Sequence, residues 1–120
     1  MGRDHTKLQV FHLPDELVVE VYKSTRGFPV EERFGLQSQL RRAAVSVAAN
    51  IVEGCTRDSR RDYLHFMSIA LGSASEVRYL VDLAQRLDIV QKAVSDDVSP
   101  KYDRLVRSLQ MLIFRVRKNA

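Results

Sequence analysis

A line of polar residues follows one side of a predicted helix in the stretch RRAAVSVAANIVEGCTR, residues 41–57. The line consists of Arg42, Ser46, Asn50, Glu53 and Arg57. Separations of 4, 4, 3 and 4 residues keep these side chains on one face, because an α-helix repeats every ~3.6 residues. Such a line could form an active site, a nucleic-acid contact, or a buried polar seam within a bundle or between subunits.

Catalytic chemistry has little support in the sequence. Glu53 has no second carboxylate or histidine on its helical face, so general acid–base catalysis would lack a partner. Cys55 with His65 as its base is a conceivable nucleophile pair, but a lone cysteine at a helix end is more often a buried small residue. An enzyme built around Glu53 and the nearby arginines remains one alternative. We predict that the protein is not an enzyme.

Metal and cofactor binding are not predicted either. The three histidines are His5, His12 and His65, and none of them lies at ligand spacing from another or from the single cysteine. The sequence contains no nucleophile elbow, Walker loop or dinucleotide fingerprint.

A structural seam is therefore the interpretation that we favour for the polar line. Buried polar residues in helical bundles often fix the register or the oligomeric state. Glu53 and Arg57 are four residues apart and can pair, and Asn50 can form hydrogen bonds across a helix interface. The predicted seam residues are Arg42, Ser46, Asn50, Glu53 and Glu76.

Positive charge is concentrated at the end of the chain. The formal net charge is +4; residues 101–120 contain six basic residues and one acidic residue, whereas residues 1–100 contain 13 basic and 14 acidic residues. A solvated helix face is the usual role of such a charge run, but the asymmetry is also typical of proteins that bind phosphate backbones. Aromatic residues are scarce there, which disfavours base stacking. The candidate nucleic-acid contacts are Arg57, Arg60, Arg61, Lys101, Arg104, Arg107, Arg115, Arg117 and Lys118.

Membrane insertion and secretion are not expected. The sequence has no apolar run near 18 residues, and its N-terminus lacks the apolar core of a signal peptide. A single cysteine is compatible with a reducing compartment. We expect a cytoplasmic protein.

Glycine and proline mark the ends of the predicted helices at positions 27–29, 54 and 99–100. We predict one domain over residues 1–120, with helices at about 14–26, 29–53, 59–87 and 99–117. Residues 89–98 could form a loop with one turn or an early start to the last helix. Short links make successive helices antiparallel, so the predicted fold class is all-α, an up-down-up-down antiparallel four-helix bundle.

The third predicted helix has the clearest pattern. Ser59 can cap its first turn, and its apolar seam follows heptad spacing through Tyr63, Phe66, Ala70, Ser73, Val77, Leu80, Ala84 and Leu87. Folding it back on the second helix would pair Leu40 with Ser73. Gly72 would then allow an unusually close approach of the two backbones.

The run GFPVEERFGLQSQLRRAAVSVAANIVEG, followed by TRDSRRDYLHFMSIALGSASEV, resembles a known bacterial family. It is the four-helix-bundle family that includes proteins encoded in intervening sequences of 23S ribosomal RNA genes. The pattern RRA-x-x-S-x-x-x-N-I-x-E-G and a following A-L-G-S are specific to it, and the resemblance covers about residues 8–90. The chain is also similar to the accessory protein of diversity-generating retroelements, a pentameric barrel of bundles that binds a reverse transcriptase and nucleic acid.

The resemblance implies a homopentamer and RNA or DNA binding, and it brings no catalytic residues. The family's motif residues fall on Arg42, Ser46, Asn50, Glu53, Gly54, Arg57, Gly72, Ser73 and Glu76. Ala48 stands where many members have proline, and Pro14 falls inside the family's first helix. We therefore expect a self-associating protein with a basic surface for nucleic acid. The alternative is an interaction scaffold that recruits an enzyme such as a reverse transcriptase and uses the basic face for an acidic protein.

Overall fold

The computed structural model describes residues 3–119, which form four long helices and two short 3₁₀ turns and contain no strand. The predicted all-α class is confirmed. Met1, Gly2 and Ala120 lie outside the described residues, as do the outer limits of the predicted domain 1–120. The elements are η1 His5–Lys7, α1 Gln9–Thr25, η2 Val30–Glu32, α2 Leu36–Cys55, α3 Arg60–Arg86 and α4 Lys92–Lys118.

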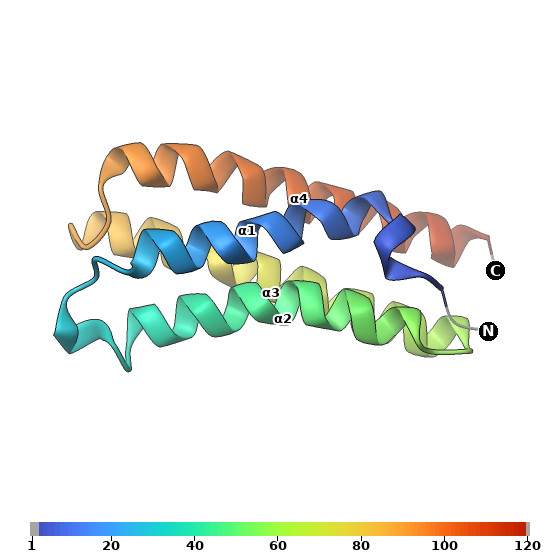
Figure 1. Ribbon diagram of the computed structural model, residues 1–120. Coiled ribbons are helices and arrows are strands. Elements are labelled where there is room, and N and C mark those ends of the chain that lie inside the picture. The colour runs from blue at the N-terminus through green and yellow to red at the C-terminus, as the bar shows by residue number, and fades with distance from the viewer. Residues whose placement is uncertain (1–2, 120) are drawn as a thin grey trace.

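Each helix packs antiparallel to the next, and α1 also packs against α4, which closes the predicted up-down-up-down bundle (Figure 1). The rod measures 46 × 22 × 19 Å. One end carries both termini and the α2–α3 turn, and the other carries the α1–α2 and α3–α4 connections (Figure 1). None of the described helices combines the length and the hydropathy that a membrane span requires.

The start of α3 is as predicted. Ser59 is its N-cap, and the Asp62 amide donates to Ser59 Oγ over 3.1 Å. The buried stripe is wider than the predicted heptad seam, because Met67, Ala74 and Val81 are buried beside it, while Leu87 is exposed. The α3 stripe therefore faces both α2 and α4, as a helix in a four-helix bundle requires.

The predicted second helix, 29–53, is wrong at both ends. The chain makes the short η2 turn first, and α2 then begins at Leu36 and continues through Gly54 to Cys55. The carboxylate of Glu32 causes the delay, since Glu32 Oε1 accepts from the Leu36 amide at 3.1 Å and caps α2. A Cβ atom at Gly35 would lie 2.7 Å from that oxygen, so the cap needs glycine there.

Both prolines that were expected to open helices lie inside them. Pro14 is buried in α1, which begins at Gln9, and Pro100 is exposed in α4, which begins at Lys92, so residues 92–98 are an early start to the last helix. A proline forfeits one backbone hydrogen bond within a helix, at a cost of roughly 3 kcal/mol. The turns that precede each proline bury apolar side chains on the core, which offsets that cost. These side chains are Leu8, Val10, Phe11 and Leu13 before Pro14, and Val94 and Val98 before Pro100.

The predicted register of α2 on α3 is also wrong. Ser73 contacts Ser46, with 2.7 Å between the two Oγ atoms, and not Leu40, because α2 runs on to Cys55 before the turn. A Cβ atom at Gly72 would meet nothing within 4 Å, so no close approach occurs there. The close approach lies at Gly54, where a Cβ atom would be 2.7 Å from Met67 Cε and 3.0 Å from Phe66 Cβ.

Candidate nucleic-acid interface

Three of the predicted contact residues lie together along one wall of an open groove between α1 and α4. Arg104, Arg107 and Arg115 are exposed on α4 and border the groove. Within residues 3–119, no carboxylate lies within ion-pair distance of any of the three. The other groove residues are mainly apolar: Leu8, Val10 and Leu13 from α1 and its N-cap, and Leu105, Ser108, Met111 and Leu112 from α4.

A second basic cluster lies at the end of the bundle that carries the termini. Arg60 and Arg61 of α3 and Arg117 of α4 line one open pocket with Leu64, His65 and Ser68. Arg60 Nη1 donates to the carbonyl oxygen of Asn119 at 3.0 Å, which ties the start of α3 to the end of α4. The helix dipole is positive at the start of α3, but the ends of α2 and α4 lie at the same end of the bundle and offset it, so the positive charge here comes from the arginine side chains.

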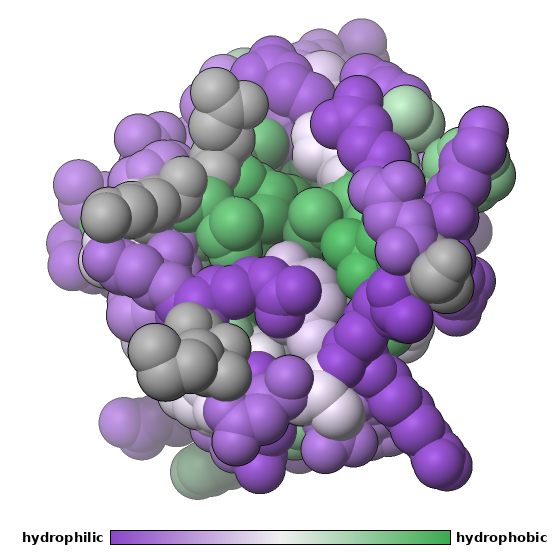
Figure 2. All heavy atoms as spheres, turned by 90° about the vertical axis from the view of Figure 1, so that its right-hand side faces the viewer, coloured by the Kyte–Doolittle hydropathy of each residue, from purple (hydrophilic) through white to green (hydrophobic). Residues whose placement is uncertain are grey.

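Figure 2 looks onto that end of the bundle. Hydrophobic side chains are exposed at the centre of the view, and hydrophilic side chains surround them. The end face therefore combines an apolar centre with a hydrophilic rim.

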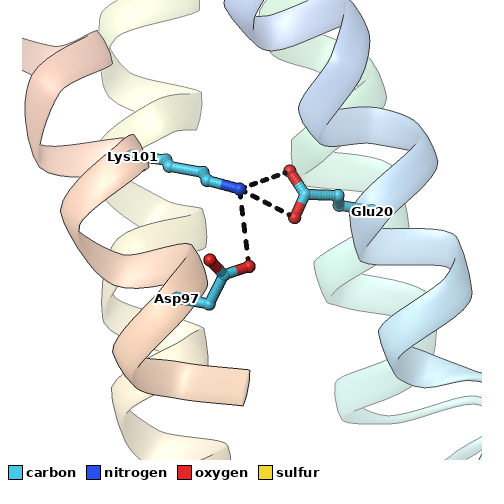
Figure 3. Close-up of polar contacts among 3 residues, drawn as sticks. All are labelled: Glu20, Asp97 and Lys101. Atoms are coloured by element: carbon cyan, nitrogen blue, oxygen red, sulfur yellow. Dashed lines mark hydrogen bonds and ion pairs between the residues drawn. The ribbon is translucent and has the colours of Figure 1, made fainter. Parts of the chain in front are cut away.

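Lys101 belongs to the internal structure of the bundle and not to a free basic face. Its Nζ lies 3.1 and 3.2 Å from the two carboxylate oxygens of Glu20 on α1 and 3.4 Å from Asp97 (Figure 3). The hydrogen bond with Glu20 raises the pKa of Lys101 and keeps the ammonium charged. The ion pair joins α1 to α4.

Arg57 is likewise engaged. It forms an ion pair with Glu53 one turn earlier, and its guanidinium lies 4.8 Å above the Phe66 ring of α3. Since Glu53 is paired in this way, its carboxylate is not a free base. Lys118 remains exposed, with Nζ 5.7 Å from the Phe114 ring.

The middle of the polar line forms a hydrogen-bonded seam between α2 and α3. Asn50 Nδ2 donates to the Ser46 carbonyl at 2.8 Å and to Ser46 Oγ at 2.9 Å. Ser46 Oγ in turn meets Ser73 Oγ. The predicted seam residues did not include Ser73. A serine among the apolar positions of the α3 heptad pattern was the feature of the sequence that could have indicated its place in the seam.

The outer members of the line are not joined to this seam. Arg42 Nη2 donates to Ser38 Oγ at 3.3 Å. Arg42 and Glu76 both border a shallow pocket beside Ser46 and Ser73, but they do not form an ion pair with each other. The seam within one bundle is therefore narrower than predicted.

The cysteine environment disfavours nucleophilic catalysis. Cys55 is buried at the end of α2, and burial raises the pKa of its thiol, which lowers the thiolate fraction. Among residues 3–119, no three His, Cys, Asp or Glu side chains are grouped as metal ligands.

Comparison with known proteins identifies the family. The model of the family described as 23S rRNA-intervening sequence protein matches residues 6–111. The chain belongs to this family. The match extends beyond the 8–90 resemblance into α4, and it includes Arg104 and Arg107 but not Arg115 or Arg117. A search of curated proteins found no match.

A solved structure from a bacterium has the same fold as this family member. It is a crystal structure of a protein of unknown function from the S23 ribosomal protein family of Bacteroides thetaiotaomicron VPI-5482. The two chains are 24% identical, with a TM-score of 0.78, and the match covers 87% of this chain and 97% of the other. The likeness to the retroelement accessory protein stays a prediction.

Proposed function

We propose that this family member is a non-enzymatic cytoplasmic protein that assembles into a homopentamer and binds the phosphate backbone of RNA or DNA through its basic surface. The observation that carries the proposal is the row of Arg104, Arg107 and Arg115, which has no carboxylate partner among residues 3–119. Arginine without an internal partner can form bidentate hydrogen bonds with phosphate.

The dimensions of the row suit a backbone ligand. Arg104 and Arg115 are eleven residues apart in α4, which corresponds to roughly 16 Å at ~1.5 Å per residue. Arg61 and Arg117 extend the positive surface around the end of the bundle. Lys101 and Arg57 form ion pairs within the bundle, so the proposed binding surface does not include them. Arg60 ties the start of α3 to the end of α4, and we propose that it positions Arg61 and Arg117.

The pentamer rests on the family resemblance. Exposed apolar side chains support self-association in general, since Val19, Tyr22, Val30, Phe34 and Val45 all lie on α1, α2 or their connection. The mass in multi-angle light scattering should be five times the chain mass of 13.8 kDa. A monomer mass would contradict the pentamer.

The binding proposal is tested by fluorescence anisotropy with a labelled RNA hairpin and a labelled DNA duplex at several salt concentrations. The double variant Arg104→Glu/Arg107→Glu should weaken binding at least tenfold and should reduce the salt slope by about two, because each phosphate contact contributes ~0.9 to the slope on duplex DNA. The control with the same change in charge is Lys23→Glu/Arg26→Glu. Both positions are exposed at the end of α1, away from the groove, which is lined by the start of α1.

An equal loss in the control variant would show that Arg104 and Arg107 are not the contact residues. The absence of binding to either ligand at low salt would instead overturn nucleic-acid binding, and the second candidate function, a scaffold that recruits an enzyme partner such as a reverse transcriptase, would then take its place. The apolar side chains of the α1–α4 groove favour that candidate, since a phosphate backbone does not require them.

A further inference from the structure

One aromatic ring in the connection between α1 and α2 lies almost entirely in water. Phe34 is 90% exposed, more than any other large apolar residue described. A half-exposed valine or leucine is ordinary in a folded protein, but a ring exposed to this extent contributes little apolar burial to the fold. Such a ring is available to an external ligand.

Phe34 borders an open pocket between this connection and the neighbouring parts of α1 and α2. The pocket also contains a second aromatic residue, Tyr22, and three arginines, Arg33, Arg41 and Arg42. Among residues 3–119, none of these arginines forms an ion pair. The pocket therefore combines aromatic surface with positive charge that the described part of the chain does not pair.

Nearby carboxylates do not reverse this charge. Glu31 and Glu32 precede Phe34 in the chain but do not line the pocket, and the Glu32 carboxylate is engaged as the cap of α2. Glu76 of α3 shares a different, shallow pocket with Arg42 and does not pair with it. A ligand in the Phe34 pocket therefore meets more positive than negative groups.

The walls of the pocket are fixed before any ligand arrives. Arg41 Nε donates to Thr25 Oγ1 at 2.8 Å and Arg41 Nη2 to the Tyr22 carbonyl at 3.2 Å, and the guanidinium carbon lies 4.6 Å from the centre of the Tyr22 ring. The residues on either side of Phe34 each donate their amide to a carbonyl three residues earlier, at 3.1 Å. Groups ordered in advance lose less conformational entropy on binding.

A nucleotide with an unpaired base fits this combination of groups. The flat face of a base can stack on the Phe34 ring, and the Arg33 guanidinium, whose carbon is 6.0 Å from the centre of that ring, can donate to the adjoining phosphate. Proteins that bind single strands place aromatic rings beside positive charge in this way. A nucleotide carries the flat face and the negative charge in one unit, whereas a protein partner would need separate apolar and acidic side chains.

We propose that the Phe34 pocket binds an unpaired nucleotide of a single strand. The base stacks on Phe34 and the adjoining phosphate accepts hydrogen bonds from Arg33, while Arg41 and Arg42 add positive charge around it. This assignment rests on the proposed nucleic-acid binding and extends it. The α4 arginines contact the backbone of any strand, and the Phe34 pocket distinguishes unpaired from paired bases.

The test compares variants of Phe34 by anisotropy with labelled oligouridylate, oligodeoxythymidylate and a DNA duplex. Phe34→Leu keeps an apolar side chain but removes the ring, so it should weaken single-strand binding at least ~5-fold and leave duplex binding unchanged; the strand that is weakened more shows whether RNA or DNA is preferred. Phe34→Tyr keeps the ring and should bind as the parent protein does. Tyr79→Leu is the control at another exposed aromatic position, on α3, and should change no affinity. Because Phe34 is exposed, the melting temperature of its variants should stay close to that of the parent.

A fluorescent reporter separates stacking from charge. The sequence contains no tryptophan, so Phe34→Trp introduces a single indole that reports on this position alone. Stacking of a base should quench the indole fluorescence when a single strand is added. An abasic oligomer carries the same phosphates without bases and should cause little quenching. Equal quenching by the abasic oligomer, or by polyglutamate, would mean that charge alone fills the pocket, and the stacking assignment would be wrong.

The role of Arg33 is tested by the dependence of single-strand affinity on salt. Arg33→Gln removes one phosphate contact and should reduce the salt slope by ~0.7. Lys23→Gln is the control, because Lys23 is exposed beside Tyr22 in the chain but does not line the pocket. An equal reduction in the two variants would overturn the placement of the phosphate beside Phe34.

Failure of this assignment is distinguishable from failure of the proposed function. If Phe34→Leu binds single strands as tightly as the parent protein, the pocket is not a stacking site, whereas the effect of Arg104→Glu/Arg107→Glu on the duplex still tests the α4 surface. Light scattering tests a second copy of the chain as the occupant. Val19 and Val30 lie outside the pocket and stay available for self-association, so Phe34→Leu should keep the parent oligomeric mass. A lower mass would place Phe34 in a subunit contact and would overturn the assignment.

Discussion

The α2–α3 hairpin and the α1–α4 side of the bundle are joined by different kinds of contact. Between α2 and α3, Gly54 lies directly under Met67, and Ser46 and Ser73 share a hydrogen bond. Between α1 and α4, Lys101 bridges to Glu20 at one level, and an open groove separates the helices nearer the termini. One side is closed by small residues, and the other stays partly open.

The difference separates the residues of the family motif from the residues available for binding. The motif residues Gly54, Ser46 and Asn50 serve helix packing on the closed side. Arg104, Arg107 and Arg115, which form no ion pair among residues 3–119, lie on the open side. The motif residues Gly54, Ser46 and Asn50 therefore support the fold, and the residues of the proposed binding surface on α4 lie outside the motif.

The largest expected difference between the two sides is in the response to equal truncations. Ile51→Ala removes a fully buried side chain of α2 and should lower the free energy of unfolding by about 2–5 kcal/mol. Leu112→Ala removes a half-buried side chain of the groove and should cost about 1 kcal/mol. Urea denaturation measures both, and equal losses would mean that the two sides are packed alike.

Two glycines sharpen the comparison. Gly54→Ala should destabilise the protein by about 1–2 kcal/mol, because Phe66 Cβ cannot move away as freely as the end of Met67. Gly72→Ala should instead stabilise the monomer by up to ~1 kcal/mol, since its Cβ enters open space within a helix. Thermal melts at one protein concentration would show opposite shifts; shifts of the same sign would contradict the packing described for α2 and α3.

The polar seam should contribute less. Asn50→Ala removes two hydrogen bonds and should cost about 1 kcal/mol, or roughly 4 °C in melting temperature for a chain of 120 residues. Gln39→Ala, at an exposed position on α2, is the control and should change stability by less than ~0.5 kcal/mol. If Asn50→Ala changed neither the melting temperature nor the oligomeric mass, the seam would have no structural role.

The smallest effect is expected on the open side, at the Lys101–Glu20 pair. Because this contact raises the pKa of Lys101 in the folded protein, its stabilisation is complete below the ordinary lysine value of 10.5 and is lost as the pH rises through the higher folded value. Lys101→Met should therefore lower the melting temperature slightly at pH 7. At a pH above the pKa of Lys101 in the folded protein, the variant and the parent protein should have the same melting temperature. Lys23→Met is the exposed control, and a difference between variant and parent that persists at high pH would rule out the ion pair as its cause.

Helix number, order and direction were predictable because each follows from local spacing and short links. Ser59 marked the start of α3 for the same reason, since a cap is a contact within one turn. The starts of α1 and α4 were not predictable from Pro14 and Pro100, because burial of the preceding turns on the core outweighs the local preference of proline. The start of α2 depends on Glu32 folding back over Gly35, which spacing does not reveal.

The candidate site divides in the same way. The sequence by itself determined that positive charge gathers in the last helix and that polar residues share one face of the second, since both are properties of composition and helical period. The Glu53–Arg57 pair was also predictable, because it joins residues four apart in one helix. Only the tertiary structure decided the state of the charges on α4. Lys101 meets Glu20 of α1, while Arg104 and Arg107 meet no carboxylate within residues 3–119, because the packing of helices distant in sequence assigns these partners. The exposure of Phe34 and the opening of the α1–α4 groove are decided at the same level.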